Sequence, residues 1–548
     1  MNLLDRAVCF VSPVRGARRA RARTAIEQET AKSALVDAQK EMVRSLVGEE
    51  ITNTGYSHGA ASRRRSWAKE FHSSSKSAKS DIEKNRKLIR ERSRDLSMNT
   101  AIGAAAVNST RTNCIGAGLI PKPKIDYEFI GISKDEANEL QKQIKKEFAL
   151  WAESTLCDNN DQNNFYELQQ IAFGDWLKNG EEFCLIMYGE KLDYMPYQLR
   201  VKLIEADRIC SPASIDGDYF GDDIKTKDGG VIVNGVEISA SGKVLAYHVC
   251  SHYPEEYSSK PAEWIRIEKR GKKTGNPNIL HIFNAERAEQ YRGVPFLAPV
   301  IETIKQMTRY TDAEIMAAVV NAMFVVFITT ENGNGIAEFG GEDEEPEEDE
   351  DDDILMGSGT VNELKVGEKV QSVESNHPSG NFNEFVTAMA THIGAALEIA
   401  PEILLKRFSN NFSASKGAMN ETWKAYRMRR TWFINDFCQE IYELWFAEAV
   451  SKGRIVAPGF FNDVAIKKAY TKCTWNGPAQ GQLDPGKEVD AAAKRVKEGF
   501  STHEDECSAL NGSDFEDNIR TLEYENELLR NINRGKKEKE DNNSGNKD

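Results

Sequence analysis

The sequence predicts an α+β chain of several domains, in which amphipathic helices flank a central antiparallel β region. Three observations predict this class. The chain has 548 residues, which is more than a single hydrophobic core usually organises. Apolar residues recur at helical spacing before residue 180 and again after residue 295. Between these positions, short runs of β-branched and aromatic residues alternate with turn residues.

The first 80 residues are predicted to form a loose arm outside the core. Residues 1–95 carry 21 Lys and Arg against 12 Asp and Glu, although the whole chain has a net charge of −15. Five of these cations are closely spaced among alanines: Arg15, Arg18, Arg19, Arg21 and Arg23. The segment is either a solvated arm or a surface that binds a scaffold, a neighbouring subunit or nucleic acid.

Helical patterns cover 82–113, 134–153 and 165–178. In the second pattern, Leu140, Ile144, Phe148 and Trp151 fall on one apolar stripe. The third ends at Asn179-Gly180, because glycine accepts the left-handed conformation that follows a helix. Glu205 and Asp207 then resemble an acid pair, but because they alternate on a strand next to Arg208 they favour a salt-bridged strand end. Five strand-like runs make up the predicted β region: Glu182–Tyr188, Leu199–Ile204, Gly230–Val236, Val244–Val249 and Ile279–Phe283.

The second half of the chain returns to helices. One is predicted from Pro295 to about Ala322, a second from Phe382 to Ala400, and a long one from Lys416 to Ser451. On the long helix, Arg427, Arg429 and Arg430 either line DNA or form salt bridges within or between subunits. The helix from Pro295 passes into a β-branched and aromatic run at 324–329. The remaining elements are strand candidates at 354–356 and 369–373, helices at 487–498 and 513–532, and a disordered tail at 535–548.

Residues 342–353 contain eleven carboxylates in twelve positions, interrupted by Pro346. Hard cations prefer oxygen ligands, but a Ca²⁺ or Mg²⁺ site needs fixed geometry and turn glycines at set spacing. The alternative is a solvated, self-repelling loop. We expect no metal site here.

Several classes of protein are excluded by motif. The chain has no GxxxxGK[ST], HExxH or GxSxG pattern, so we expect no enzyme activity and no cofactor. Nine scattered cysteines without a CxxC pair indicate reduced thiols, with Cys184 and Cys250 in the core. Neither a signal peptide nor an apolar run of about 20 residues is present, so no membrane partner is expected.

Ordered fragments along the chain carry a family resemblance. The first are Val11-Ser12-Pro13, Ile89–Leu96 and Asn113–Gly118. In the β region they are Leu203–Ile209, Ala246–Val249 and, most specific, His281-Ile282-Phe283 with Gln290-Tyr291-Arg292-Gly293-Val294-Pro295. Ile393–Leu397, Pro401–Leu404 and Asp484–Glu488 follow in the same order. Together they resemble the lambda-type phage portal family, with departures at Asn411–Lys416 and at the acidic run.

The resemblance implies a multi-domain portal subunit of crown, wing, stem and clip, with a long helical stem and an antiparallel β wing and clip. That plan assigns every segment of the chain to a part of the subunit. In chain order the parts are a basic N-terminal arm (1–81), the wing (82–293), a stem helix (294–322), the clip with the acidic insertion (323–381), a second stem helix (382–405), a tunnel loop (406–416), a long wing helix and return (417–486), crown helices (487–534) and the tail (535–548).

The same resemblance implies the candidate site residues. A DNA-channel loop would contain Lys406, Arg407, Asn410, Asn411 and Lys416, which can touch phosphates without reading sequence. Lys406 and Arg407 equally suit a helix C-terminus, where the dipole favours cations. At the clip, an acidic collar would be formed by Glu342, Asp343, Glu344, Glu345, Asp349, Asp351, Asp352 and Asp353.

The implied function is a ring-shaped channel at one capsid vertex, through which terminase packages DNA and from which DNA is later ejected. Its implied partners are about eleven further copies, the large terminase subunit, head-completion or adaptor proteins, major capsid and scaffold proteins, and double-stranded DNA held non-specifically. The expected location is the virion, with the host cytoplasm during assembly. The rivals are another head structural protein, either capsid or scaffold, and a nuclease or protease.

Overall fold

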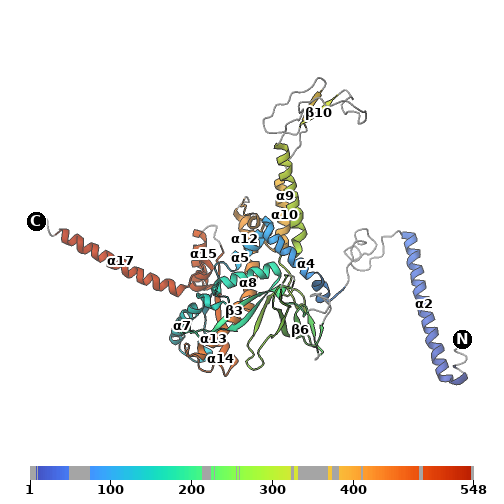
Figure 1. The fold of residues 1–548 in the computed structure, drawn as a ribbon, viewed down its shortest axis with the longest axis horizontal. Helices are drawn as coiled ribbons and strands as arrows, with labels where there is room; N and C mark the ends of the chain where they lie inside the picture. Colours follow the sequence, from blue (N-terminus) through green and yellow to red (C-terminus); the bar gives the residue numbers. More distant parts are fainter. Residues whose placement is uncertain are drawn as a thin grey trace. The chain divides into compact units, whose positions relative to one another are not determined.

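In the computed structural model, the chain divides into two compact units, Met1–Lys76 and Ser77–Asp548. The structure describes these residues: 8, 10–47, 75–212, 224–226, 229–254, 256–257, 259–322, 326–330, 368–372, 382–408, 412–480 and 485–544. In the first unit a helix, α2 (Pro13–Val47), replaces the loose arm that we expected over these residues (Figure 1). Alanine and arginine, which favour helices, dominate its first half.

The second unit begins with two helices where we expected one. α4 (Ala78–Asn99) and α5 (Ala101–Cys114) are separated at Thr100, whose backbone is extended. The Thr100 hydroxyl accepts the N–H of Gly103 and so caps α5. A capping threonine inside an apparently continuous helical pattern therefore divides it. α4 also starts before residue 81, where the predicted arm ended.

Two further helices agree with their predicted patterns. α7 (Lys134–Ala152) begins with a capping box formed by Ser133 and Glu136. α8 (Phe165–Asn179) ends at Gly180, which has a φ of 86°. The expected apolar stripe of α7 packs into the core, with Phe148 and Trp151 almost fully buried.

The β region forms two antiparallel sheets. A three-stranded sheet has the order β3-β2-β9 and contains β2 (Glu181–Tyr188), β3 (Leu199–Glu205) and β9 (Ile279–Phe283). A five-stranded sheet follows chain order: β4 (Ile224–Lys225), β5 (Val231–Val233), β6 (Val236–Ile238), β7 (Val244–Cys250) and β8 (Trp264–Glu268).

The run Gly230–Val236 is therefore a hairpin, and its interpretation as one strand was wrong. Val233 pairs with Val236 across the two-residue loop Asn234-Gly235. Both loop residues have positive φ, as a tight hairpin of this kind requires. Asn-Gly between apolar residues is the signal that identifies such a turn.

Two long helices flank, in the sequence, the segment that carries the acidic run. α9 (Ile301–Ala322), after the short η3 (Ala298–Val300), lies beside α10 (Phe382–Leu397) (Figure 1). The ring of Tyr310 is 4.4 Å from that of Phe385, centroid to centroid. Beyond these helices, β10 (Val326–Thr330) pairs antiparallel with β11 (Glu368–Ser372). β11 overlaps the strand candidate 369–373, and β10 overlaps the β-branched run 324–329. The other strand candidate, 354–356, lies outside the described residues.

The long helix predicted from Lys416 begins earlier and changes type midway. It comprises α12 (Phe412–Phe433), a π-helical turn, η4 (Ile434–Cys438), and α13 (Gln439–Ser451). Its aromatic residues join the main core, where Trp445 is fully buried and lies edge-on to Phe148. Trp423 is also buried and Trp432 partly so.

The C-terminal segments pack against the start of the second unit. β12 (Cys473–Asn476) pairs with β1 (Ile120–Pro123), and α17 (Phe515–Ser544) is helical through most of the tail that we predicted to be disordered. Residues 545–548 lie outside the described part. The other short elements are α6 (Tyr127–Ile130), η1 (Thr155–Cys157), η2 (Ala206–Arg208), α11 (Pro401–Leu405), α14 (Val464–Thr471), α15 (Pro485–Lys497) and α16 (His503–Leu510).

Among the described residues, no helix is long and apolar enough to cross a membrane. Their cysteines are free, and both Cys184 and Cys250 are fully buried, as the sequence predicted.

Candidate functional site

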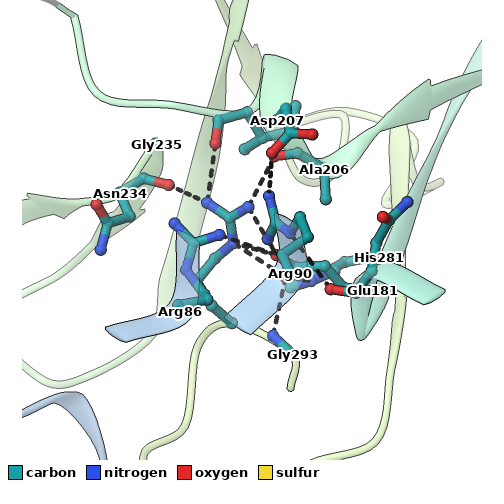
Figure 2. A network of polar contacts seen from close by, with 12 residues as sticks. Arg86, Arg90, Glu181, Ala206, Asp207, Asn234, Gly235, His281 and Gly293 are labelled. Atoms are coloured by element: carbon teal, nitrogen blue, oxygen red, sulfur yellow. Dashed lines mark hydrogen bonds and ion pairs between the residues drawn. The ribbon is translucent and has the colours of Figure 1, made fainter. Parts of the chain in front are cut away.

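A buried cluster of charged side chains joins the N-terminal helix of the second unit to both sheets. Its centre is Glu181, the first residue of β2, which is fully buried. The Nε of Arg292 lies 2.8 and 2.9 Å from its two carboxylate oxygens. Arg90 on α4 donates to the same carboxylate at 2.6 Å, and His281 on β9 lies 2.9 Å from it (Figure 2).

The cluster extends outward through the arginines of α4. Arg86 pairs with Glu83 at 3.0 Å and reaches Glu181 at 3.5 Å. Arg90 also donates to Asp207 at 2.8 Å, and Arg94 pairs with the same aspartate. Four guanidinium groups, including that of Arg292, therefore share three carboxylates. The inner part of the cluster around Glu181 is buried, whereas Arg94 and Asp207 are partly exposed.

Arg292 also satisfies backbone carbonyls from two other segments. Its guanidinium donates to the carbonyl oxygens of Ile209 at 2.9 Å and Ala206 at 3.0 Å, and to that of Asn234. Because buried carbonyls need a hydrogen-bond partner, this one side chain fixes the end of β3 and the β5–β6 hairpin together. A planar guanidinium with five donors suits this role, whereas a lysine does not.

Two glycines allow the backbone to approach this cluster closely. A Cβ on Gly293 would lie 2.0 Å from the carbonyl oxygen of Gly180, and one on Gly180 would lie 2.3 Å from the carbonyl carbon of Val294. The Gly293 N–H donates to Glu181 at 2.9 Å (Figure 2). The segment that leads to η3 and α9 is therefore seated directly on the end of α8.

The charge states in the cluster follow from burial and neighbours. Burial alone raises the pKa of Glu181, but Arg292, His281 and Arg90 outweigh it and hold that pKa well below its usual value. Burial and two neighbouring guanidiniums lower the pKa of Arg86 to about 9. Burial also lowers the pKa of His281. At neutral pH the cluster therefore contains ionised Glu181, cationic arginines and neutral His281.

The neighbouring Glu182 has the opposite environment. It is 1% exposed, and burial, Asp175, Glu205 and Glu181 together raise its pKa well above the usual value. Within the described part of the chain, its Oε2 has no hydrogen-bond partner. Adjacent glutamates at the start of β2 thus have opposite preferred charge states.

Arg208 does not make the salt bridge predicted at the end of β3. Asp207 pairs with Arg90 and Arg94 of α4, whereas Arg208 donates to the carbonyl oxygens of Cys250 and Ser251. The end of β3 is therefore salt-bridged, as predicted, but its cations are two arginines more than 100 residues away in sequence and not Arg208. Sequence reasoning missed Glu181 because its partners Arg90, His281 and Arg292 are also far away in sequence. The signal that could have found it lies in the family-like fragments Ile89–Leu96, Leu203–Ile209 and His281–Phe283 with Gln290–Pro295, which contain most of the cluster.

The expected channel loop 406–416 is shorter than predicted, because α12 already begins at Phe412. Lys416 is therefore helical, and its Nζ lies 2.7 Å from Glu488 of α15. Lys406 ends α11 with a φ of 51°, and Arg407 donates to Asn383 at the start of α10 at 2.5 Å. Asn410 and Asn411 lie outside the described residues.

The other charged residues named from the sequence either have partners within the subunit or lie outside the described residues. Arg429 pairs with Glu398 at 2.8 Å, and Arg430 donates to the carbonyl oxygens of Asn113, Cys114 and Pro478. Both therefore have structural partners within the subunit. The acidic run 342–353 lies outside the described residues. Elsewhere in the described chain no group of acidic, His or Cys side chains is placed to hold a metal ion.

Comparison with known proteins decides the family. The family model described as "Phage portal protein, lambda family" matches residues 62–430, about two-thirds of the chain. The chain belongs to the lambda family of phage portal proteins. Portal protein B of Escherichia phage lambda is 21% identical over 446 residues, which cover 78% of this chain and 81% of the relative. The portal protein of Escherichia phage N15 matches with the same identity and coverage.

One further relative and two solved structures match most of the chain. A probable portal protein of Halomonas phage phiHAP-1 is 21% identical over 433 residues, covering 78% of this chain and 77% of the relative. Among solved structures, the virion of a native gene transfer agent particle contains a chain with 12% identity and a TM-score of 0.39. The match covers 77% of this portal protein and 92% of that chain. A chain from the neck of that particle, computed with C12 symmetry, has 14% identity and a TM-score of 0.34, over 67% of this chain and 88% of that one.

As a portal protein, the chain belongs to a structural class rather than to an enzyme class. Its α+β architecture of several domains agrees with the prediction. In this setting the arginine–glutamate cluster has a mechanical role. It fixes α4, both sheets and the start of the α9 segment to one another.

Proposed function

We propose that the protein forms a ring-shaped channel at one vertex of a phage head, through which terminase packages double-stranded DNA and through which the DNA is later ejected. The ring also docks head-completion or adaptor proteins and contacts the capsid and scaffold. The virion is its final location, and the host cytoplasm is where it assembles. The energy for translocation comes from the terminase, not from this chain.

One observation carries this proposal. Two long helices lie side by side, and the segment that connects them in the sequence begins and ends with a pair of antiparallel strands. α9 leads to β10, β11 returns to α10, and the family match spans all of these elements. Such a unit can line an axis, with the helices as the stem (294–322 and 382–405) and the segment 323–381 as the clip. The wing then corresponds to residues 82–293 and 417–486, and the crown to residues 487–534.

Exposed apolar side chains on α9 support assembly with further copies. Ile315 is 58% exposed, Met316 is 63% exposed and Val319 is 45% exposed, and all three lie on one short stretch of the helix. Exposed apolar groups gathered on one stretch of a helix are typical of a protein interface. A ring repeats a head-to-tail contact around its axis, so the same face would be buried in each copy.

Electron microscopy with mass determination on the purified protein tests the ring. We expect rings of about twelve subunits with a hole of roughly 20 Å or more, the width of duplex DNA. The variant Ile315→Glu/Val319→Glu should reduce ring formation, whereas Gln306→Glu, an exposed polar position on the same helix, should not. A wild-type protein that stays monomeric or dimeric at all concentrations and salt levels would overturn the proposal.

Within this proposal, Lys406, Arg407, Asn410 and Asn411 are the groups closest to passing DNA. Lys416 contributes less, because Glu488 already neutralises it. The collar residues of 342–353 face a basic surface on terminase or an adaptor. Replacing the carboxylates of 342–353 by their amides should weaken terminase binding while rings persist. Unchanged binding would remove the collar from the proposal.

The rival assignments fit less well. A scaffold is expected to be almost wholly helical, whereas this chain contains a five-stranded and a three-stranded sheet. A nuclease or protease needs a metal or nucleophile site, and the charged cluster around Glu181 offers arginines with structural partners instead.

A further inference from the structure

The first half of α2 has an unusual composition. Residues 15–25 contain only arginine, glycine, alanine and threonine. The side chains of all five arginines are exposed: Arg15, Arg18, Arg19, Arg21 and Arg23. Along the helix they extend over about 12 Å, since each residue adds about 1.5 Å. Guanidinium groups are therefore the one chemistry that this surface offers.

The arginines lie on one side of the helix. At about 100° per residue they cover an arc of about 200°. The remaining arc contains small side chains, among them Gly16 and Ala20. Between residues 13 and 39, all of which the structure describes, Gly16 and Ala20 are the positions that are not exposed. The small face is thus the more covered one, and the cationic face is turned to solvent.

The position of these cations at the start of a helix is unfavourable in isolation. The first turn of α2 contains no acidic residue, and the first carboxylate of the helix is Glu27. Glu27 is 3.4 Å from Arg23, at the far end of the cationic stretch. Because the N-terminal end of a helix already has a partial positive charge, further cations there repel it. An anion bound at this end would remove that repulsion.

The composition also selects among anionic partners. A stable protein interface needs large apolar or aromatic side chains at its centre, and an anionic membrane needs an apolar helix face to insert. Residues 15–25 provide neither, and the exposed apolar side chains that border them, Val14 and Ile26, stand singly at the two ends of this stretch. A nucleic-acid backbone requires neither, because its phosphates bind arginine in bidentate geometry and succeed one another at about 1.7 Å of duplex axis per charge.

We propose that α2, through Arg15, Arg18, Arg19, Arg21 and Arg23, binds the phosphate backbone of nucleic acid without reading its sequence. This would be a second nucleic-acid contact, made by residues of the first compact unit and not by the residues proposed for the channel loop. The proposal does not rest on the ring, because DNA can pass through a channel without touching α2.

Fluorescence anisotropy with the full-length protein and a labelled 20-base-pair duplex tests the proposal. Neutralising about five phosphates gives a slope of roughly −4.5 in log affinity against log salt, or about a 500-fold loss of affinity between 50 and 200 mM salt. Replacing all five arginines by glutamine, which keeps helix propensity, should abolish most of this affinity and flatten the slope. Replacing them by lysine should retain most of it.

Matched measurements make the outcome decisive. Lys272→Gln/Lys273→Gln removes two exposed cations elsewhere and should leave DNA binding unchanged. A labelled single-stranded RNA identifies whether RNA binds by the same chemistry, and either nucleic acid supports the proposal if binding is lost in the glutamine variant. Equal DNA affinity of wild type and glutamine variant overturns it. So does polyglutamate binding as tightly as DNA, since the partner is then an acidic protein.

Discussion

Arg292 and Glu181 form an ion pair that is closed to solvent. Both oxygens of the carboxylate lie within 2.9 Å of the Arg292 Nε, and both side chains are 0% exposed. The two residues are 111 positions apart and come from the start of β2 and the segment before η3. Since three guanidiniums converge on one carboxylate, removing that carboxylate leaves several buried cations without their main partner.

The first prediction is that Glu181→Gln destabilises the second unit strongly. Removing one partner from a buried charge cluster typically costs about 3–5 kcal/mol. The amide cannot neutralise Arg90 and Arg292, although it can still accept hydrogen bonds. We expect a clear fall in the thermal unfolding midpoint. Glu91→Gln, at an exposed position of α4 whose nearest cation is 3.9 Å away, should change it little. Equal midpoints for the two variants would contradict the role given to Glu181.

The same substitution one residue later should have the opposite effect. Glu182 has a raised pKa, so at pH 7 folding forces a proton onto it or leaves an unpaired buried charge. The raised pKa contributes stability below the unfolded value near 4.5, and this is lost as the pH rises through the folded value. Glu182→Gln, which mimics the protonated form, should raise the free energy of unfolding at pH 7, as measured by urea unfolding. The gain should disappear near pH 4. A loss of stability at pH 7 would be the contrary result.

Much of the fold was predictable because its signals are local. The spacing of Ile144, Phe148 and Trp151 predicted α7, and Asn179-Gly180 predicted where α8 ends. The apolar alternation of 182–290 predicted most strands of the two sheets. The predictions that failed also have local reasons. Thr100 caps a second helix within a continuous pattern, and Asn234-Gly235 turns a run of valines into a hairpin.

The buried cluster was not predictable from the same patterns. Arg86, Arg90 and Arg94 occur in a strongly charged helix and look like a solvated face, yet Arg86 and Arg90 are 3% and 2% exposed. Apart from Glu83, which is three residues from Arg86, their acidic partners Glu181 and Asp207 are 91 to 117 residues away in sequence. Hydrophobic periodicity does not indicate which charged residues are buried when the burial depends on pairing across the fold.

The third prediction concerns the close approach of two glycines. Gly293→Ala places a methyl group 2.0 Å from the Gly180 carbonyl oxygen, a distance that requires the backbone to move. We expect a marked loss of stability or of soluble protein. The matched control is Gly417→Ala in α12, where nothing lies within 4 Å of the added methyl group. That variant should be neutral or more stable by up to about 1 kcal/mol, because alanine favours helices. Similar behaviour of the two variants would refute the close packing.

The fourth prediction is an acid-sensitive component of stability from His281. Its ring stacks between Phe183 and Phe283, and burial lowers its pKa below 6.5. Above pH 6.5 neither the folded nor the unfolded state holds the proton. Below it, the unfolded state is protonated first, so stability falls with pH until the folded pKa is reached.

His281→Gln should make the dependence of the unfolding free energy on pH shallower between pH 6.5 and 5.5, by up to about 1.4 kcal/mol per pH unit. Urea unfolding at several pH values measures it. His392→Gln, on an exposed position of α10, provides the reference for removing a histidine. An unchanged slope for His281→Gln would show that this ring does not contribute.

The last prediction concerns the attachment of the C-terminal helices. Asp514 precedes α17, and its Oδ2 lies 2.6 Å from Lys145 of α7 and 3.2 Å from Lys122 of β1. Its Oδ1 separately accepts the N–H of Glu516 and so caps α17. Asp514→Asn keeps an oxygen for the cap but removes the charge that holds α17 to the two lysines. We expect faster proteolytic removal of α17 from this variant, with the difference largest at low salt, where exposed ion pairs are least screened.

The matched control is Asp517→Asn, whose carboxylate is 3.5 Å from Lys145 and 56% exposed. This variant should have a much smaller effect. If the two variants are cleaved at the same rate, packing rather than charge holds this helix in place.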